Sequence, residues 1–369
     1  MIRGTSWAVS RFSLLGRPVR GSDVRLRCSG LSVAAFLGVL TVKRFVSAIP
    51  LLMAIFAFAS LIPGRAQNAG TPQQQPPSNG APPANPLKVA LLKWYPANKI
   101  TSFPVGKQPL GVAFDGADIW VTNNDDATVS KLRASDGADL GTFNVGGAPM
   151  GVAFDGANIW VANSFDNTVS KLRASDGKTL GTFAVGKVPY FLAFDGDAMW
   201  VTNSQGLSVT KLRVSDGKTL GTFSDSLGPG GVAFDGTYIW VTNFQDTVTR
   251  FKLDGRQAGT FKVGLGPVGV AFDGADMWVA NGGDGTVTKL RASDGAVLGT
   301  FNVGGIPYGI VFDGINIWVA TAPGVVELRP SDGTIVFALL LRCCEAGIAF
   351  DGANIWAVNG HGPYYVSKL

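Results

Sequence analysis

The chain has very few of the residues that most enzymes use for acid–base chemistry. It contains one histidine, His361, and two glutamates, Glu327 and Glu345. Charged residues of all kinds make up 15% of the sequence, well below the roughly 25% of an ordinary soluble domain. General acid–base catalysis draws mainly on histidine and on carboxylates. The composition therefore argues against an active site built from clusters of such groups.

Cysteine is also scarce, with three residues in the chain. Cys28 lies near the N-terminus and Cys343 is followed directly by Cys344, so a framework of several disulfides is excluded. Two states of the adjacent pair stay open: a strained vicinal disulfide in an oxidising compartment, or two reduced, small apolar side chains. The sequence has no phosphate-binding glycine loop and no metal-ligand spacing.

The basic character of the chain belongs to its N-terminal segment. The whole sequence has a formal charge of +5, but residues 1–66 hold nine lysines and arginines against one acid, Asp23. The remaining residues hold 22 basic and 25 acidic side chains, a net charge of −3. A slightly acidic surface gives no electrostatic reason to bind DNA or RNA, so we expect no nucleic-acid partner.

The same N-terminal segment has the pattern of an export signal. A basic pair, Lys43-Arg44, precedes an apolar run over 45–62 and the small-x-small motif Gly64-Arg65-Ala66. We expect residues 1–66 to be a presequence cleaved after Ala66, and the protein to be secreted, periplasmic or on the cell surface. The alternative is a retained membrane anchor, since 18 apolar residues can just span a bilayer.

Beyond a linker at 67–86, which is rich in proline and glutamine and is predicted to be disordered, the chain is repetitive. The tripeptide Phe-Asp-Gly occurs seven times, at spacings of 38 or 40 residues. Such a period is typical of repeat architectures, in which one unit cannot bury its apolar surface alone. The copies begin at Phe114, Phe154, Phe194, Phe234, Phe272, Phe312 and Phe350.

Each repeat contains four short runs that resemble strands. In the unit over 149–186, the runs GVAF, IWVAN, TVSKLR and TLGTFAV are separated by Asp-Gly, Asn-Ser and Ser-Asp-Gly turns. No run has apolar residues at helical spacing. Four antiparallel strands per repeat of this length form a propeller blade. The sequence therefore predicts an all-β fold over residues 87–369: one seven-bladed β-propeller domain, which we expect to be a monomer.

The predicted ring closes with strands from both ends of the sequence. The last repeat reaches only its third strand, at 365–369, whereas residues 99–105 align with the fourth strand of a blade. Placing 99–105 beside 365–369 removes two unpaired edges. In the alternative closure, both strand-like runs within 89–106 complete the last blade, and 365–369 stays unpaired.

Three residue types recur along the blades, the tryptophan and aspartate in all seven and the asparagine in all but blade six, which has Thr321. Each has a structural and a functional interpretation. The tryptophans either pack between blades or form a platform for sugars, and packing is favoured because every blade has one. The aspartates of Phe-Asp-Gly either hold turns or bind calcium, and the turn is favoured because ligands of one ion must converge. The asparagines that end the second strand are expected to bond nearby backbone, the alternative being a ring of carboxamides at the channel mouth. The tryptophans are Trp120, Trp160, Trp200, Trp240, Trp278, Trp318 and Trp356.

The segment Trp120-Val121-Thr122-Asn123, which recurs at 200–203 and 240–243, resembles the tetrapeptide that names the YVTN β-propeller family. The Asn-Thr-Val-Ser run at 167–170 and the Val-Gly-x-x-Pro linkers are similar too. The resemblance covers about residues 87–369. It implies a seven-bladed propeller of a kind common in secreted and cell-surface proteins, often with a binding role.

The period is also similar to that of the virginiamycin B lyase group. That group opens a cyclic depsipeptide antibiotic with the help of histidine, glutamate and a magnesium ion. The resemblance implies that an enzyme of this type would use His361 and Glu345 as catalytic residues and Mg²⁺ as cofactor. A lyase of this type is the alternative to a protein with a binding role.

Function is expected on the face of the channel mouth, where loops interrupt the repeat. Five repeat-breaking residues are the candidate ligand contacts: Tyr190, Tyr308, Glu345, His361 and Tyr364. The competing interpretation is drift in the last blade, since terminal repeats are often atypical. We expect a binding scaffold for a small molecule, glycan, peptide or protein, without cofactor or metal. Contact with His361 would make binding depend on pH near 6–7.

Overall fold

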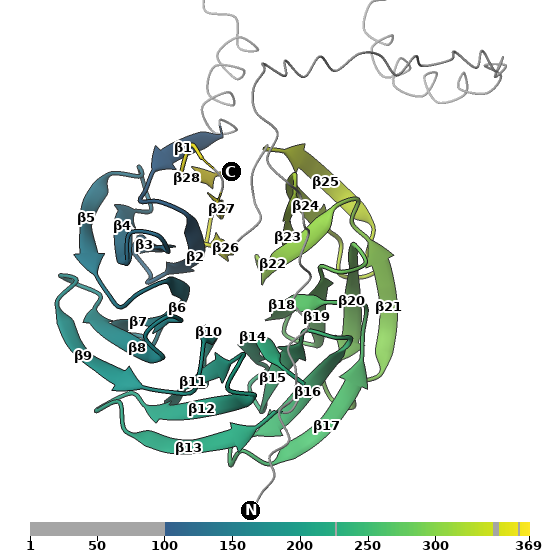
Figure 1. Cartoon of the computed structure of the whole chain (residues 1–369). Helices are drawn as coiled ribbons and strands as arrows, with labels where there is room; N and C mark the ends of the chain where they lie inside the picture. Colours follow the sequence, from purple (N-terminus) through teal and green to yellow (C-terminus); the bar gives the residue numbers. More distant parts are fainter. Residues whose placement is uncertain (1–99, 226, 342–346, 361) are drawn as a thin grey trace, which may run out of the picture. The chain divides into compact units, whose positions relative to one another are not determined.

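The structure, a computed structural model, describes residues 100–225, 227–341, 347–360 and 362–369. These residues form seven four-stranded antiparallel sheets arranged around an axis, as Figure 1 shows. The prediction of an all-β propeller with seven blades is confirmed. The presequence and the linker over 67–86 lie outside the described residues. No helix among the described residues is long and apolar enough to cross a membrane.

The first three blades have strands of six residues throughout. Blade one contains β2 (Pro109–Phe114), β3 (Asp118–Asn123), β4 (Thr128–Arg133) and β5 (Asp139–Asn144). Blade two contains β6 (Pro149–Phe154), β7 (Asn158–Asn163), β8 (Thr168–Arg173) and β9 (Thr179–Ala184). Blade three contains β10 (Pro189–Phe194), β11 (Ala198–Asn203), β12 (Ser208–Arg213) and β13 (Thr219–Ser224).

Blades four to six continue the pattern. Blade four contains β14 (Pro229–Phe234), β15 (Tyr238–Asn243), β16 (Thr247–Lys252) and β17 (Gln257–Lys262). Blade five contains β18 (Pro267–Phe272), β19 (Asp276–Asn281), β20 (Thr286–Arg291) and β21 (Val297–Asn302). Blade six contains β22 (Ile306–Phe312), β23 (Ile317–Ala322), β24 (Gly324–Leu328) and β25 (Ile335–Leu340).

Blade seven combines strands from both ends of the described chain. It contains β26 (Ile348–Phe350), β27 (Ile355–Asn359), β28 (Tyr365–Lys368) and, as its outer strand, β1 (Thr101–Pro104). β1 pairs antiparallel with β28, with Thr101 opposite Lys368 and Pro104 opposite Tyr365. The Phe103 ring stacks on Trp356 at 5.6 Å, in the way that Phe143 lies 5.6 Å from Trp120 in blade one.

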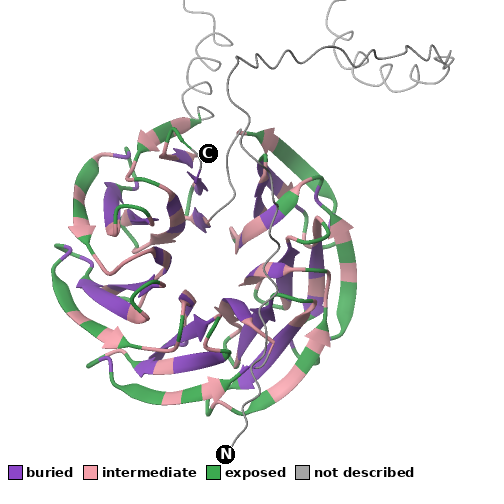
Figure 2. Ribbon diagram, viewed as in Figure 1, coloured by how far each residue is buried: buried purple, intermediate pink, exposed green. Residues whose placement is uncertain are grey.

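The tryptophans pack between blades. Trp160 lies in one core cluster with Leu192, Met199 and Val201 of the next blade, and Trp356 of blade seven packs with Ile119 of blade one. Six of the seven have no exposed surface, Trp318 being the exception. Figure 2 shows the consequence: burial is concentrated in the middle strands, while the outer strands are largely exposed. The packing interpretation of the tryptophans is confirmed.

Each Phe-Asp-Gly aspartate ties its turn to the tryptophan of its own blade. In blade two, Asp155 Oδ1 accepts the backbone N–H groups of Ala157 and Asn158, while Oδ2 accepts from Trp160 Nε1 at 2.7 Å. The tryptophan bond occurs in all seven blades at 2.7 or 2.8 Å. The turn interpretation is confirmed, and the carboxylate also satisfies a buried indole donor.

The strand-end asparagines have the expected backbone partners in part and, in addition, side-chain partners. Asn163 Oδ1 accepts from the Gly146 N–H at 3.1 Å, as expected. Asn123 is buried, and its Nδ2 donates to the hydroxyls of Thr128 and Ser130 on the third strand rather than to backbone. A Cβ on Gly106 would lie 2.5 Å from the Asn123 side chain, so the linker glycine covers this amide closely. These carboxamides therefore stabilise the interior of a blade and do not form an exposed ring at the mouth.

Candidate ligand site in the central channel

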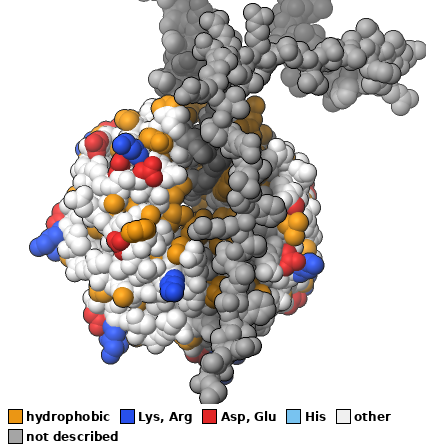
Figure 3. Space-filling model, viewed as in Figure 1, with side chains coloured by type: hydrophobic (Ala, Val, Ile, Leu, Met, Phe, Trp, Pro, Cys, Tyr) orange, Lys and Arg blue, Asp and Glu red, His pale blue; other side chains and the backbone are white. Residues whose placement is uncertain are grey.

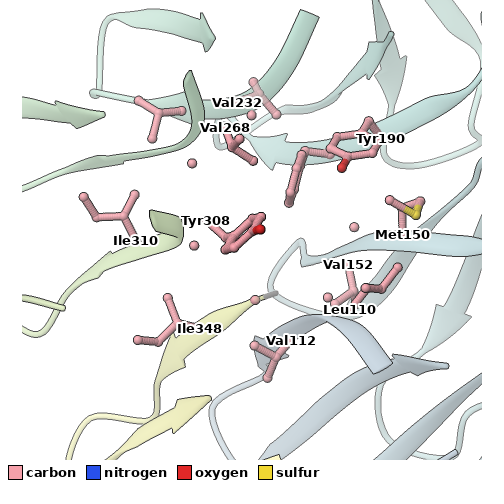
Figure 4. Close-up of a pocket in the computed structure, with 18 residues that line it drawn as sticks. Leu110, Val112, Met150, Val152, Tyr190, Val232, Val268, Tyr308, Ile310 and Ile348 are labelled. Atoms are coloured by element: carbon pink, nitrogen blue, oxygen red, sulfur yellow. The ribbon is translucent and has the colours of Figure 1, made fainter. Parts of the chain in front are cut away.

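The first strands of all seven blades enclose a cavity of about 210 Å³ on the axis, shown in Figure 4. Three consecutive positions along these strands line it, and blades three, four and seven contribute two of the three. The first position contributes Leu110, Met150, Tyr190, Val268 and Tyr308. The second contributes Phe191 and the glycines 111, 151, 231, 269, 309 and 347. The third contributes Val112, Val152, Val232, Val270, Ile310 and Ile348.

The glycine position exists because neighbouring strands approach each other closely there. A Cβ on Gly111 would lie 2.4 Å from the Met150 carbonyl oxygen, and one on Gly231 would lie 2.1 Å from that of Val268. The Thr122 hydroxyl bridges the same junction, since it accepts from the Gly111 N–H and donates to the Met150 carbonyl, both at 2.7 Å. The threonine of the repeated Trp-Val-Thr-Asn motif thus links one blade to the next.

Blade three departs from this pattern and places aromatic rings in the channel. Phe191 occupies the position that is glycine in the other six blades, and its N–H donates to Thr202 Oγ1 at 3.1 Å. Its ring meets the Tyr190 ring edge-on at 4.8 Å. Tyr190 in turn lies 5.7 Å from Phe244 of blade four, again edge-on. Three aromatic rings therefore cluster where blades three and four meet at the channel.

Gly230 is closely packed beside this cluster and does not line the cavity, since a Cβ there would lie 2.9 Å from Thr242 Oγ1. The other described blades carry a larger side chain at that position, such as Met150 or Tyr308. A Cβ on Gly230 would approach the Phe244 ring to 3.3 Å. Phe244, which is 40% exposed, stands where blades one and two have Asn124 and Ser164. The cluster therefore combines added aromatic rings with a removed side chain.

The lining residues that the structure describes carry no charged side chain. Their polar side-chain groups are the hydroxyls of Tyr190 and Tyr308, whose rings project into the channel in Figure 4. Burial raises the pKa of the Tyr190 phenol above its usual value, and the nearby Tyr308 adds to this effect. Tyr190 therefore stays neutral near pH 7, and its hydroxyl can donate or accept a hydrogen bond. Figure 3 shows hydrophobic side chains gathered near the centre of this face.

One buried acid lies near the same junction of blades. Asp225 is 1% exposed and follows β13 where blades two and five have Val185 and Val303. Burial raises the pKa of its carboxyl, although the Leu227 N–H lowers it. With its amide nitrogen toward Asp225, Asn243 donates to both carboxylate oxygens at 3.0 and 3.2 Å. Asp225 therefore stabilises the loop and does not line the cavity.

The structure brings together two of the five residues expected at the site. Tyr190 and Tyr308 line the cavity, whereas Tyr364 does not. The backbone carbonyl of Tyr364 accepts a hydrogen bond from the Val105 N–H at 3.4 Å. Glu345 and His361 lie outside the described residues, as does the Cys343-Cys344 pair. Among the described residues, no three His, Cys, Asp or Glu side chains are grouped so that they could hold a metal ion.

Sequence reasoning missed Phe191 and Phe244. Phe191 was detectable as a departure from glycine at the second position after the linker proline. Phe244 was not, because its contact with Tyr190 joins residues of two different blades. Glu327, one of the two glutamates of the sequence, lies on β24 and does not line the cavity. Its Oε1 accepts a hydrogen bond from Asn316 Nδ2 at 2.6 Å.

Comparisons with known proteins agree with the fold. The sequence matches no protein-family model and no curated protein. Among solved structures, a chain of the hydrazine synthase of Kuenenia stuttgartiensis is similar at a TM-score of 0.60 and 16% identity, over 72% of this chain and 96% of that one. The U3-55K protein is similar at a TM-score of 0.63 and 13% identity, over 73% of this chain and 98% of that one. At these identities the likeness is one of fold, and this chain is a seven-bladed propeller with propellers as structural neighbours.

Proposed function

We propose that the protein is an exported binding module, secreted, periplasmic or held at the cell surface, whose ligand enters the central channel. The observation that carries the proposal is the aromatic cluster of Tyr190, Phe191 and Phe244 beside Gly230. These residues interrupt a repeat whose other features are explained by turns and packing. Ligand sites are typically concave and apolar, with a few polar groups that fix orientation.

The lining indicates the kind of ligand. The described lining residues carry no charged group, so they offer no compensation for desolvating a charged ligand. Edge-on aromatic contacts and the two phenolic hydroxyls suit a flat, neutral, apolar group that carries one hydrogen-bonding atom. We infer an aromatic small molecule, or an aromatic side chain of a peptide, inserted between Tyr190 and Tyr308.

Titration with a neutral solvatochromic dye, Nile red, tests the proposal. The variants Phe191→Gly and Tyr190→Met introduce residues that other blades carry at these positions, so the fold should tolerate them. We expect each to weaken binding about tenfold, which corresponds to ~1.4 kcal/mol and to the loss of one aromatic contact.

Phe165→Ala is the matched control, since this phenylalanine is 81% exposed and does not line the cavity. It should bind the dye as the wild type does. If Phe191→Gly and Tyr190→Met also bind with unchanged affinity, the channel is not the site.

A further inference from the structure

The face of the propeller around the channel mouth is built from two kinds of connection. These are the linkers that lead into the first strands and the loops between the second and third strands. The two kinds are joined within a blade: the Phe165 N–H donates to the Gly147 carbonyl at 3.1 Å, and the Gly283 N–H donates to the Leu265 carbonyl at 2.8 Å. The residues at the first lining position of the cavity follow the linker prolines directly. The cavity therefore lies next to this surface, which we call the mouth face.

Blades two to six each expose one large apolar side chain on the mouth face. Phe165 is 81% exposed and Leu265 is 57% exposed, whereas blade one has Asp125 and Lys107 at the corresponding positions. Exposed apolar side chains that gather around one site are typical of an interaction surface. We call this set the apolar arc: Phe165, Leu207, Phe244, Leu265 and Ile306.

The middle of the apolar arc is continuous with the channel. Phe244 belongs both to the arc and to the aromatic cluster, since its ring lies 5.7 Å from that of Tyr190. The carbonyl of the next residue, Gln245, accepts from the Gly266 N–H at 2.8 Å, so the loop of Phe244 lies next to the linker of Leu265. The cavity of about 210 Å³ is smaller than the roughly 300–1,000 Å³ of typical ligand pockets. A ligand of ordinary size that fills it therefore extends onto the arc.

The mouth face also carries an unbalanced negative charge. Besides the buried Asp225, its described connections hold five aspartates and two lysines. Of these five, Asp246 forms the one ion pair with a described cation, Lys262 at 3.6 Å. On the opposite face, by contrast, exposed aspartates such as Asp176 are paired with an arginine of the same turn at 3.0 Å. The mouth face therefore attracts cations. The five aspartates are Asp125, Asp126, Asp166, Asp246 and Asp284.

Two of these carboxylates are held beside members of the apolar arc. Asp166 follows Phe165, and its Oδ2 accepts from the Gly147 N–H at 2.7 Å. Asp284 Oδ2 accepts from the N–H of Leu265 itself at 2.8 Å. An apolar side chain next to a fixed carboxylate matches lysine and arginine, which combine an aliphatic stem with a charged end. A second copy of this face would place carboxylates against carboxylates, which disfavours self-association here.

Building on the channel site proposed above, we propose that the ligand is a peptide segment rich in lysine or arginine. One aromatic side chain of the segment enters the cavity beside Tyr190. The flanking basic side chains lie on the apolar arc, with their stems against Phe244 and Leu265 and their charges toward the aspartates of the mouth face. The charges of the ligand thus stay outside the uncharged lining, where water and carboxylates solvate them.

Isothermal titration calorimetry of the full chain with two matched peptides tests the proposal. The probes are acetyl-Lys-Ala-Trp-Ala-Lys-amide and acetyl-Glu-Ala-Trp-Ala-Glu-amide, which share the aromatic residue and differ in charge. We expect the lysine peptide to bind about tenfold more tightly, because like charges repel the glutamate peptide. The difference should shrink in about 1 M salt, where the Debye length is about 3 Å. Equal affinities at low salt would overturn the proposal.

A pair of charge-removing variants locates the contact. Asp166→Asn combined with Asp284→Asn keeps a side-chain oxygen that can accept the same backbone N–H groups. It should weaken binding of the lysine peptide about fivefold, as expected for the loss of two exposed ion pairs. Asp176→Asn combined with Asp216→Asn removes the same charge from the opposite face and should leave the affinity unchanged. Equal affinities of the two double variants would place the peptide elsewhere.

Nile red separates a failure of this proposal from a failure of the channel site, because the dye is neutral and needs only the cavity. Dye binding should be the same in both double variants as in the wild type. If Phe191→Gly and Tyr190→Met bind the dye with unchanged affinity, the channel site is wrong and the peptide proposal fails with it. If these variants lose dye binding while the lysine and glutamate peptides bind equally, the channel site stands and the basic peptide alone is rejected.

Discussion

At the residue scale, the hydrogen bond between aspartate and tryptophan is the contact that repeats most strictly. Burial of the Asp155 carboxyl raises its pKa, but the bonds from Trp160, Asn158 and the backbone outweigh this and hold the pKa below its usual range. The same balance lowers the pKa of Asp195 and Asp351. Ionised aspartates therefore stabilise the fold, because the folded protein binds these protons less readily than the unfolded chain.

The sign of this linkage predicts acid sensitivity. A depressed carboxyl pKa contributes stability that is present above the unfolded value of about 4 and is lost as pH falls through the folded value. We expect the melting temperature to be flat from pH 7 to about 5 and to fall below about pH 4. Calorimetric scans over this range measure it. A melting temperature that is unchanged down to pH 3 would contradict the prediction.

Asp155→Asn removes the charge with little change of shape. The hydrogen bond from Trp160 Nε1 loses its charged acceptor, which should cost about 1.5–3 kcal/mol in the free energy of unfolding. Asp125→Asn, on an exposed loop, is the control and should stay within about 0.5 kcal/mol of the wild type. Chemical denaturation of the three proteins at pH 7 makes the comparison. An equal cost for the two variants would mean that the bond contributes nothing specific.

At the element scale, β1 carries the contacts that join the two ends of the propeller. It pairs with β28 along four residues, Ser102 Oγ and Ser367 Oγ lie 3.0 Å apart, and the Phe103 ring both stacks on Trp356 and covers Gly137 of blade one. Without β1, the outer edge of β28 would be unpaired and open to association with another chain.

Deleting residues 98–106 should therefore destabilise the propeller. The loss of Phe103 alone predicts a cost of about 3–5 kcal/mol, and the exposed edge of β28 predicts aggregation. Deleting 71–79, an equal length of the proline-rich linker, should leave the melting temperature unchanged. Thermal unfolding and size-exclusion chromatography compare the two. A shortened protein that melts with its parent and stays monomeric would show that another strand closes the ring.

The sequence was sufficient for the blades because each is specified locally. Phe-Asp-Gly sets a turn, the tryptophan five residues after the aspartate binds that same carboxylate, and Asn123 ends the second strand, all within a few residues of one another. The candidate site was only half predictable, since Tyr190 and Tyr308 break the repeat visibly. The contact of Tyr190 with Phe244 depends on how two blades meet, which no single repeat specifies.

At the scale of the whole molecule, the propeller and the segment before it differ in character. Residues 1–66 carry most of the excess positive charge and the long apolar run, whereas the rest of the sequence is slightly acidic. We expect export to remove the presequence and to leave Gln67 as the first residue. N-terminal sequencing of protein exported by the native host decides this. A chain that still contains Phe45 would indicate an anchored protein.

The pH dependence of ligand binding distinguishes a ligand held by Tyr190 and Phe191 from one that contacts His361 of blade seven. The described lining contains no carboxylate, imidazole or thiol, and burial raises the pKa of the Tyr190 phenol. A neutral ligand held by Tyr190 and Phe191 should therefore bind with the same affinity between pH 5.5 and 8. Contact with His361 would instead make affinity vary near pH 6–7, where an unperturbed histidine changes charge.

Titrating the wild type and a His361→Ala, Glu345→Gln double variant with Nile red at several pH values distinguishes the two cases. We expect flat and equal profiles, since the aromatic cluster supplies the contacts. A change of affinity near pH 6–7 that disappears in the double variant would place the ligand on blade seven, where the sequence pattern first directed attention. A melting temperature of the double variant equal to that of the wild type would show that any lost binding reflects the ligand contact itself.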